Sequence, residues 1–226
     1  MSVNEVDATP GAGRRVMSVR EVDTIGEAWI DIARHIMRDG ATSTYDALAI
    51  REVGPVALCV RRPSSTDPII ERLADRERLE WMHSNFTDTR RVPALGDADS
   101  YATRLHDYEH SGRDQLDWVV ERLRRDPLSR SATITTFQPL SDTSYIPCVS
   151  LLDFYVEDSA LQLVVYAHSI DFGAKGYANL VELAAISEDV SARLGLHVGA
   201  LTMIVKSAHV YASDDDYMNR VLLERE

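Results

Sequence analysis

The sequence predicts a single large domain of the α+β class, in which helices pack on a mostly continuous β-sheet. Three observations support this class. Apolar residues recur at helical spacing in two clear segments, β-branched and aromatic residues gather in several others, and no internal repeat or low-complexity segment is visible. A chain of 226 residues is also long enough to bury a sizeable core. We therefore expect one domain over residues 27–226, preceded by a flexible arm over residues 1–26.

The first half of the chain contains the predicted arm and the clearest helices. Residues 10–13 supply a proline and two glycines without an apolar period, which is typical of a loosely docked segment. Apolar residues at helical spacing predict helices over residues 27–40 and 114–126. Between them, residues 47–60 are predicted to form one or two strands, and the charged segment 67–86 is predicted to be helical in part.

The second half of the chain is dominated by predicted strands with turn-like breaks between them. These strands cover residues 132–137, 149–156, 161–167 and 201–212. The break at residues 157–159 predicts a hairpin. The apolar run from Tyr177 to Leu194 predicts a buried helix, because Gly195 can adopt the left-handed conformation that closes helices.

Charge and cysteine content narrow the class of ligand. The formal net charge of −12 disfavours an extended groove for nucleic acid, which needs a surplus of lysine and arginine. No secretory leader and no apolar run long enough to span a bilayer are visible. With two cysteines in all, we expect a cytoplasmic protein that binds a small molecule. Cys59 lies in the apolar run 56–60 and is assigned to the core.

Cys148 is the other cysteine, and it opens a predicted strand directly after the irregular stretch 139–146. Loops at a strand entrance can leave a thiol accessible, and a nucleophilic thiol needs a nearby cation or donor that stabilises the thiolate. Position alone favours the simpler interpretation of a small apolar residue at a strand start. The surrounding motifs favour catalysis.

Six short motifs occur in one order and at one spacing that resemble the thymidylate synthase family. They are Asp126-Pro127-Leu128-Ser129-Arg130, Pro147-Cys148, Phe154-Tyr155-Val156, Ser169-x-Asp171, Asn179 and His209-x-Tyr211. Each motif is weak alone, but the joint match over residues 126–211 is specific. The resemblance extends more faintly over residues 27–223. It implies a large mixed sheet packed with helices, whose sheet forms the interface of a homodimer.

The resemblance also implies a reaction. Cys148 is expected to add to C6 of a pyrimidine, so that C5 attacks the one-carbon unit of 5,10-methylenetetrahydrofolate, the implied cosubstrate. Asn179 is expected to bind the O4/N3 edge of the base, and His209 with Tyr211 the sugar hydroxyl. An amide at this position favours uracil over cytosine, for which an aspartate is better suited.

Three further positions match residues that bind the phosphate and the folate in the family. Arg130 and Ser169 are expected to bind the nucleotide phosphate, with Arg130 contributed across the homodimer interface. Asp171 is expected to contact the folate pterin. Taken singly, such residues are more often caps or turn residues, and only the joint match assigns them to a site.

The sequence departs from the family in its charges. Ser131 and His168 replace two arginines of the phosphate site, one of which also lies beside the thiol. We expect a protonated His168 to supply part of that activation near neutral pH. Lys175 is a new charge on the folate side.

The catalytic glutamate of the family has two candidates. Glu77 and Glu80 both lie in the segment that resembles its E-L-L-W motif, and Glu80 is favoured because it adjoins Trp81. A metal site built on His168 and Asp171 is disfavoured, since no further histidine or cysteine lies at a matching spacing.

The leading hypothesis is therefore C5 methylation or hydroxymethylation of a pyrimidine nucleotide. Because the phosphate site has lost arginines, a nucleoside that carries no phosphate stays open as an alternative substrate. Two alternatives also stay open: a non-catalytic nucleotide-binding homologue that has lost its arginines, and a folate-independent enzyme that uses the same thiol addition.

Overall fold

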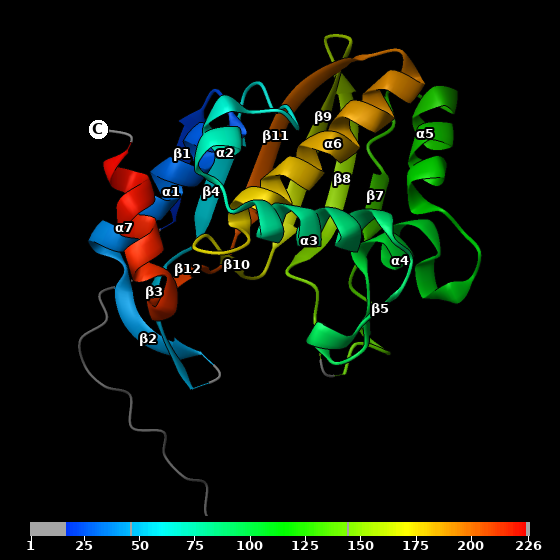
Figure 1. The fold of residues 1–226 in the computed structure, drawn as a ribbon. Helices are drawn as coiled ribbons and strands as arrows, with labels where there is room; N and C mark the ends of the chain where they lie inside the picture. Colours follow the sequence, from blue (N-terminus) through cyan, green and yellow to red (C-terminus); the bar gives the residue numbers. More distant parts are fainter. Residues whose placement is uncertain (1–16, 46, 144, 225–226) are drawn as a thin grey trace, which may run out of the picture.

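The computed structural model describes residues 17–45, 47–143 and 145–224, which form an α+β fold around a six-stranded mixed sheet (Figure 1). Within this sheet, β1 pairs with β4 and β11 with β9 in parallel, and the other neighbours are antiparallel. Its strands, in spatial order, are β1 (Ser18–Val22), β4 (Val56–Val60), β11 (His197–Val205), β9 (Ala160–Ala167), β8 (Val149–Glu157) and β7 (Ala132–Thr135). The predicted fold class is confirmed.

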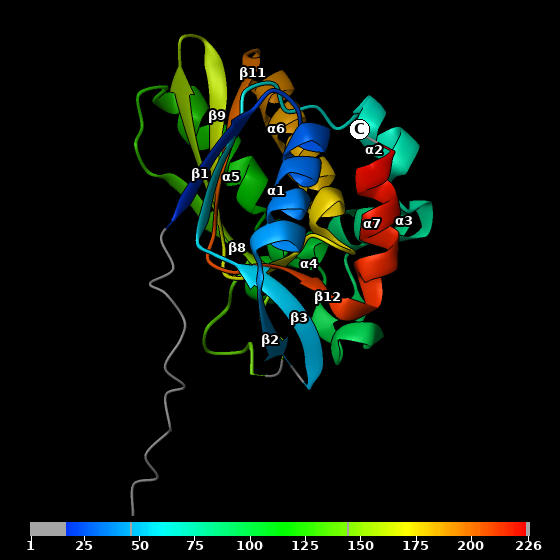
Figure 2. The same cartoon turned by 90° about the vertical axis from the view of Figure 1, so that its left-hand side faces the viewer.

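Three long helices cover one face of this sheet, as Figure 2 shows. The helix α6 (Gly176–Leu194) packs on β9 and β11, with α1 (Ile25–Asp39) over β1 and β4 and α5 (Gln115–Arg125) over β7 and β8. The indole Nε1 of Trp29 donates to the carbonyl oxygen of Phe172 at 2.9 Å. This bond ties α1 to the loop that leads into α6.

A smaller sheet lies at the lower left of the molecule in Figure 1. The smaller sheet consists of β10 (Ile170–Asp171), β12 (Ala208–Tyr211), β3 (Leu48–Val53) and β2 (Ala41–Tyr45). A two-stranded ribbon joins β5 (Arg91–Val92) and β6 (Ala98–Asp99). The other helices are α2 (Pro68–Leu73), α3 (Arg76–Thr87), α4 (Tyr101–His106) and α7 (Asp215–Leu223).

The three helices with the clearest sequence patterns are confirmed to within two residues. Helix α1 begins at Ile25, two residues before the predicted start, because the Thr24 hydroxyl caps it. The side chain of Asp114 caps α5 in the same way. Helix α6 ends at Gly195, which adopts a left-handed φ of 71°.

Two expectations about element boundaries differ from the structure. Residues 18–22, assigned to the flexible arm, form the edge strand β1, which pairs with β4 along five residues. The segment 201–212 forms two strands in different sheets, since the chain turns at Lys206 and Ser207. The segment 67–86, expected to be helical in part, is confirmed as such, with two helices separated by Ala74 and Asp75. The rest of the predicted arm, residues 1–16, lies outside the described residues.

The two sheets bring distant parts of the chain to one place. Strand β10 follows β9 directly and pairs in parallel with β12, so that Asp171 lies opposite His209. The first turn of α6 follows eight residues after the end of β9, and Cys148 immediately precedes β8. Within the described residues, no helix is both long enough and apolar enough to cross a membrane.

Candidate functional site

Seven of the nine predicted site residues line a single cavity of about 490 Å³, which we call the Cys148 cavity. They come from the start of β8, the segment between β9 and α6, the first turn of α6, and β12. They are Cys148, His168, Ser169, Asp171, Asn179, His209 and Tyr211. Their convergence in space matches the expectation that they form one site.

The backbone of the two sheets fixes this arrangement. The amide of His168 donates to the carbonyl oxygen of Cys148 at 3.1 Å, which holds the end of β9 against the entrance of β8. The amide of Phe172 donates to the carbonyl oxygen of His209 at 2.7 Å, which holds β10 against β12. Residues on neighbouring strands are therefore positioned by ladder bonds that do not depend on a ligand.

The environment of the Cys148 thiol both opposes and supports ionisation. Burial of the largely covered side chain raises the pKa of the thiol, and the carboxylate of Asp171 adds to this effect. The ammonium group of Lys175 and a hydrogen bond from Tyr145 lower that pKa but do not fully offset the burial. The free protein therefore holds Cys148 mainly as the neutral thiol at neutral pH.

The surroundings of His168 do not favour it as the cation of this thiol. Burial and the nearby Lys206 lower the pKa of His168, so its imidazole is neutral at neutral pH. Its Nδ1 lies 3.3 Å from the hydroxyl oxygen of Ser150. The expectation that a protonated His168 replaces the arginine beside the thiol is therefore not supported, although His168 does line the cavity.

Asn179 presents one unused hydrogen-bonding atom. Its Nδ2 donates to the carbonyl oxygen of Lys175 at 3.0 Å, one turn earlier in the helix. Its Oδ1 is buried and has no partner among the described residues, and the side chain is only 4% exposed. A buried acceptor without a donor is costly, so this oxygen is suited to accept from a ligand N–H group.

Ser169, His209 and Tyr211 form a polar wall of the cavity. The Ser169 hydroxyl oxygen lies 3.3 Å from Nδ1 of His209, and the rings of His209 and Tyr211 meet edge to face at 5.2 Å between centroids. Burial lowers the pKa of His209, so its ring is neutral and can both donate and accept. This combination suits a hydroxyl group.

Asp171 has an unusual carboxyl group for a turn residue. Its Oδ1 accepts from the amides of Gly173 at 3.0 Å and Ala174 at 3.2 Å. Burial first, and the nearby Asp214 second, nevertheless raise the pKa of Asp171 to about 6. The carboxyl can thus accept from amino or imino groups of a flat ring, and the Trp81 indole in the same cavity offers that ring a stacking face.

Two predicted residues do not reach the cavity. Glu80 lies exposed on α3, and Arg130 lies exposed in the segment after α5. Glu77, the other candidate for the glutamate, lines a separate small cavity that also includes Lys175. The catalytic role of Glu80 and the phosphate-binding role of Arg130 stay predictions.

Several residues of the cavity lie outside the motifs, and three of them are polar side chains that the sequence did not single out. Tyr45 comes from the hairpin of β2 and β3, Asn85 from α3, and Tyr145 from the irregular stretch before Cys148. Proximity to the thiol in sequence is a usable signal for Tyr145. No local pattern could have identified Tyr45 or Asn85, because both reach the cavity through tertiary packing.

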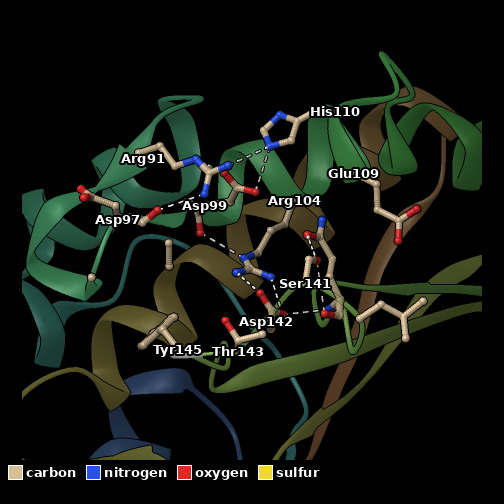
Figure 3. A pocket seen from close by; sticks show the side chains of 14 residues that line it. Arg91, Asp97, Asp99, Arg104, Glu109, His110, Ser141, Asp142, Thr143 and Tyr145 are labelled. Atoms are coloured by element: carbon tan, nitrogen blue, oxygen red, sulfur yellow. Dashed lines mark hydrogen bonds and ion pairs between the residues drawn. The ribbon is translucent and has the colours of Figure 1, made fainter.

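A second cavity of about 410 Å³ lies next to the first and is shown in Figure 3. The guanidinium of Arg104 points at the carboxylate of Asp142, and the Nε2 of His110 lies 3.1 Å from Oδ2 of Asp99. Tyr145 lines both cavities. The charged groups of the second cavity pair mainly with one another, so this region supports the segment that carries Tyr145.

Positive charge is scarce in the Cys148 cavity. Among the described residues that line it, Lys175 is the one with a permanent positive charge. Its Nζ lies 5.4 Å from the centroid of the Trp81 ring. No group of three or more histidine, cysteine, aspartate or glutamate side chains suited to a metal ion occurs among the described residues.

Comparison with known proteins gives one consistent result. The family model described as thymidylate synthase matches residues 65–226. A protein named "Putative thymidylate synthase" from Methanosarcina barkeri is 32% identical over 203 residues, covering 88% of this chain and 92% of the relative. A protein of the same name from Methanosarcina mazei is 35% identical over 201 residues, covering 88% and 91%.

A relative with a different name matches a shorter region. The protein named "Deoxyuridylate hydroxymethyltransferase" from Bacillus phage SP01 is 38% identical over 108 residues. The match covers 45% of this chain and 28% of the phage protein.

Proposed function

Since this chain belongs to the thymidylate synthase family, we propose that it transfers a one-carbon unit to C5 of a pyrimidine through a covalent bond between Cys148 and C6 of the base. The observation that carries this proposal is the convergence of the thiol, five further motif residues and His168 on one cavity. The one-carbon unit comes from 5,10-methylenetetrahydrofolate, which acts as cosubstrate.

The first step uses Cys148 as a nucleophile. The thiolate forms a bond to C6, and the electron pair of the C5–C6 double bond moves toward C5 and O4, which makes C5 nucleophilic. C5 forms a bond to the methylene carbon as one of its two bonds to folate nitrogen breaks, and C5 then loses its proton. The second carbon–nitrogen bond breaks with tetrahydrofolate as the leaving group. Addition of hydride or water to the resulting exocyclic methylene expels the thiolate as the S–C6 bond breaks. Because the free thiol is mainly protonated, its proton must leave before or during the addition.

The base and the sugar are held by the polar residues of the cavity. The free Oδ1 of Asn179 accepts from N3–H of a uracil ring, which is a donor at that position. Ser169, His209 and Tyr211 contact the sugar hydroxyl and its substituents. Asp171 and Trp81 hold the flat ring of the folate, whose donor groups suit a buried carboxyl.

A phosphate on the substrate needs more positive charge than one subunit supplies. We propose that Arg130 of a second copy completes the site in a homodimer, because the described part of one chain brings only Lys175 to the cavity as a permanent cation. Arg130→Ala is then expected to raise KM for a nucleotide at least tenfold and to leave KM for the free nucleoside unchanged. Equal effects on both would contradict this role.

Hydroxymethylation is the second candidate product, and the named phage relative favours it. Methylation needs a reductive step that delivers hydride to the new carbon, whereas hydroxymethylation needs water at the same carbon. Product analysis by mass spectrometry separates the two, since the added groups differ by one oxygen atom.

The proposal is tested by release of tritium from C5-labelled pyrimidines. The panel consists of dUMP, UMP, CMP and the free nucleosides, each with and without methylenetetrahydrofolate. Folate-dependent release that Cys148→Ser abolishes and Cys59→Ser preserves is the expected result. Release without folate favours an enzyme limited to thiol addition. No release from any member, with pyrimidine binding retained, favours a non-catalytic binding protein.

A further inference from the structure

The thiol site lacks the positive charge that its family resemblance leads one to expect. The position that matches the family's arginine is His168, which is neutral at neutral pH. The site nevertheless has one fixed cation, because Lys175 lies at the start of α6 and lines the same cavity as Cys148. The electrostatic effect of its ammonium group extends to Cys148, Asp171 and His209 alike.

The position of Lys175 is restrained on two sides. Its Nζ lies over the Trp81 ring at 5.4 Å, and its carbonyl oxygen accepts from both the backbone N–H and the side-chain Nδ2 of Asn179. These contacts join the lysine to α3 and to the first turn of α6. Because packing on the indole already restricts the lysine side chain, less conformational entropy is lost when its ammonium group interacts with an anion.

The second unassigned partner of the thiol is Tyr145. It precedes Cys148 by three residues and lines the same cavity, and its hydroxyl, as a potential donor to the thiol sulfur, lowers the pKa of Cys148. The segment that carries it is anchored by Asp142, which pairs with the buried Arg104 and also accepts from the amide of Gln138 at 2.8 Å. Figure 3 shows this anchor beside Tyr145.

We propose that Tyr145 and Lys175 together stabilise the Cys148 thiolate, Tyr145 as a hydrogen-bond donor to Sγ and Lys175 as the fixed positive charge of the cavity. Tyr145 is then a catalytic residue, because its hydroxyl contacts the reacting sulfur. Lys175 stabilises the thiolate through the electrostatic field of its ammonium group. The catalytic meaning of this pair rests on the proposed function, whereas its effect on the thiol does not.

The protons balance with Tyr145 as a permanent donor. Burial and the neighbouring thiol raise the pKa of Tyr145 far above its ordinary value, so the phenol keeps its proton while the thiol loses one to solvent. When the S–C6 bond forms, the sulfur lone pair enters the bond and the hydroxyl loses its anionic acceptor. When that bond breaks, the thiolate returns to the same O–H donor.

Other titratable groups face the thiol from the surrounding elements, and each has a defined effect. Asp171 on β10 opposes thiolate formation, and the pKa of Tyr101 on α4 is raised by burial, so its phenol stays neutral. His168 and His209 are neutral at neutral pH. Among the residues that the structure describes, Tyr145 and Lys175 are thus the side chains that favour the thiolate.

The test measures the thiol pKa in the substrate-free protein, from the rate of iodoacetamide alkylation against pH in a Cys59→Ser background. Tyr145→Phe and Lys175→Met are each expected to raise the pKa of Cys148 by about one, a tenfold loss of thiolate. Lys175→Arg is expected to restore the original value, because it restores the charge.

Two matched controls remove a tyrosine hydroxyl and a lysine ammonium group outside the Cys148 cavity. Tyr166→Phe alters a tyrosine that is 38% exposed on β9, and Lys206→Met alters the lysine beside His168, and neither residue lines the Cys148 cavity. Both controls are expected to leave the thiol pKa unchanged. A Tyr145 or Lys175 variant that folds, as judged by circular dichroism, and leaves the pKa within 0.3 of its control would overturn that residue's role.

Tyr145→Phe removes only the hydroxyl and keeps the ring in place. If it fails to fold, 3-fluorotyrosine at position 145 provides the test, since its more acidic hydroxyl should lower the thiol pKa. An unchanged pKa overturns the role of Tyr145.

The measurement of the thiol pKa and the tritium-release assay of the proposed function can fail independently of each other. Unchanged thiol pKa values together with folate-dependent tritium release would remove this inference and leave the function in place. Shifted pKa values without any tritium release would remove the function and leave the two thiol partners in place.

Discussion

Arg104 and Asp142 form a bidentate ion pair in the protein interior, with Nη1 2.8 Å from Oδ2 and Nη2 2.7 Å from Oδ1. The Arg104 side chain is among the largest fully buried ones, at 1% exposure. Its Nε and Nη1 also donate to the carbonyl oxygens of Asp99 and Thr136. The pair therefore joins α4 to the segment that leads to Cys148, and it satisfies the charge that it buries.

Loss of one partner of this pair is expected to be severe. Asp142→Asn leaves the Arg104 charge buried without a counter-ion and should lower the free energy of unfolding by roughly 3–5 kcal/mol, measured by urea denaturation. Asp189→Asn breaks the exposed pair with Arg193 and serves as the control, with an expected loss of about 0.5 kcal/mol or less. Equal losses in the two variants would contradict the structural role of the interior pair.

The reactivity of Cys148 is expected to rise with pH through the neutral range. Burial raises the pKa of this thiol, so the thiolate is the minor form at pH 7 and increases about tenfold for each pH unit below that pKa. Alkylation of the Cys59→Ser protein and C5-tritium release should both follow this rise. A profile that is flat from pH 6 to 8 would show that the thiol is already ionised there.

His168 is expected to have little influence on that profile. Its lowered pKa means that it loses its proton below neutral pH, so no charge change occurs where the thiol titrates. His168→Gln should leave the pKa of Cys148 within about 0.3 of its original value. An increase of one or more would return His168 to the role of the activating cation.

Asp171 is expected to make stability depend on pH between about 4 and 6. Its pKa is raised from 3.8 to about 6 on folding, so the folded state holds the proton more tightly than the unfolded state. The free energy of unfolding is therefore highest when Asp171 is protonated and falls as pH rises through this range. Above pH 6 the ionised Asp171 lowers the free energy of unfolding by roughly 3 kcal/mol, and by less where water in the cavity solvates the carboxylate.

Asp171→Asn tests this penalty. The amide keeps an oxygen for the Gly173 and Ala174 amides but cannot ionise, so the variant should be more stable at pH 8 by roughly 1–3 kcal/mol. The difference should vanish near pH 4. If Asp171 also contacts the folate, KM for methylenetetrahydrofolate rises in the same variant. A variant that is less stable at pH 8 would contradict the assigned cause.

Asn179 is expected to determine the choice of base. Its amide can match the N3–H donor and the O4 acceptor of uracil, whereas a carboxylate only accepts and suits the exocyclic amino group of cytosine. Asn179→Asp should shift the ratio of kcat/KM for dUMP to that for dCMP at least tenfold toward dCMP, about 1.4 kcal/mol. Asn85→Asp alters another amide of the same cavity and should leave the ratio unchanged.

Local sequence determined much of this protein. Helical periodicity and caps located α1, α5 and α6, because burial of one helix face and satisfaction of the first turn are local requirements. The ordered motifs also identified six residues that share one cavity with His168. That inference rested on the resemblance of the ordered motifs to the thymidylate synthase family, because the residues come from several separate elements of the fold.

Tertiary structure alone decided the rest. The strand β1 has no partner within its own segment and is recognised only when it pairs with β4, some forty residues away. The protonation state of His168 depends on its burial and on Lys206, and the ionisation of Cys148 depends on Lys175 and Tyr145. A pKa reflects the distance to charges that other elements deliver, so a motif can name a nucleophile but cannot say which side chains stabilise its charge.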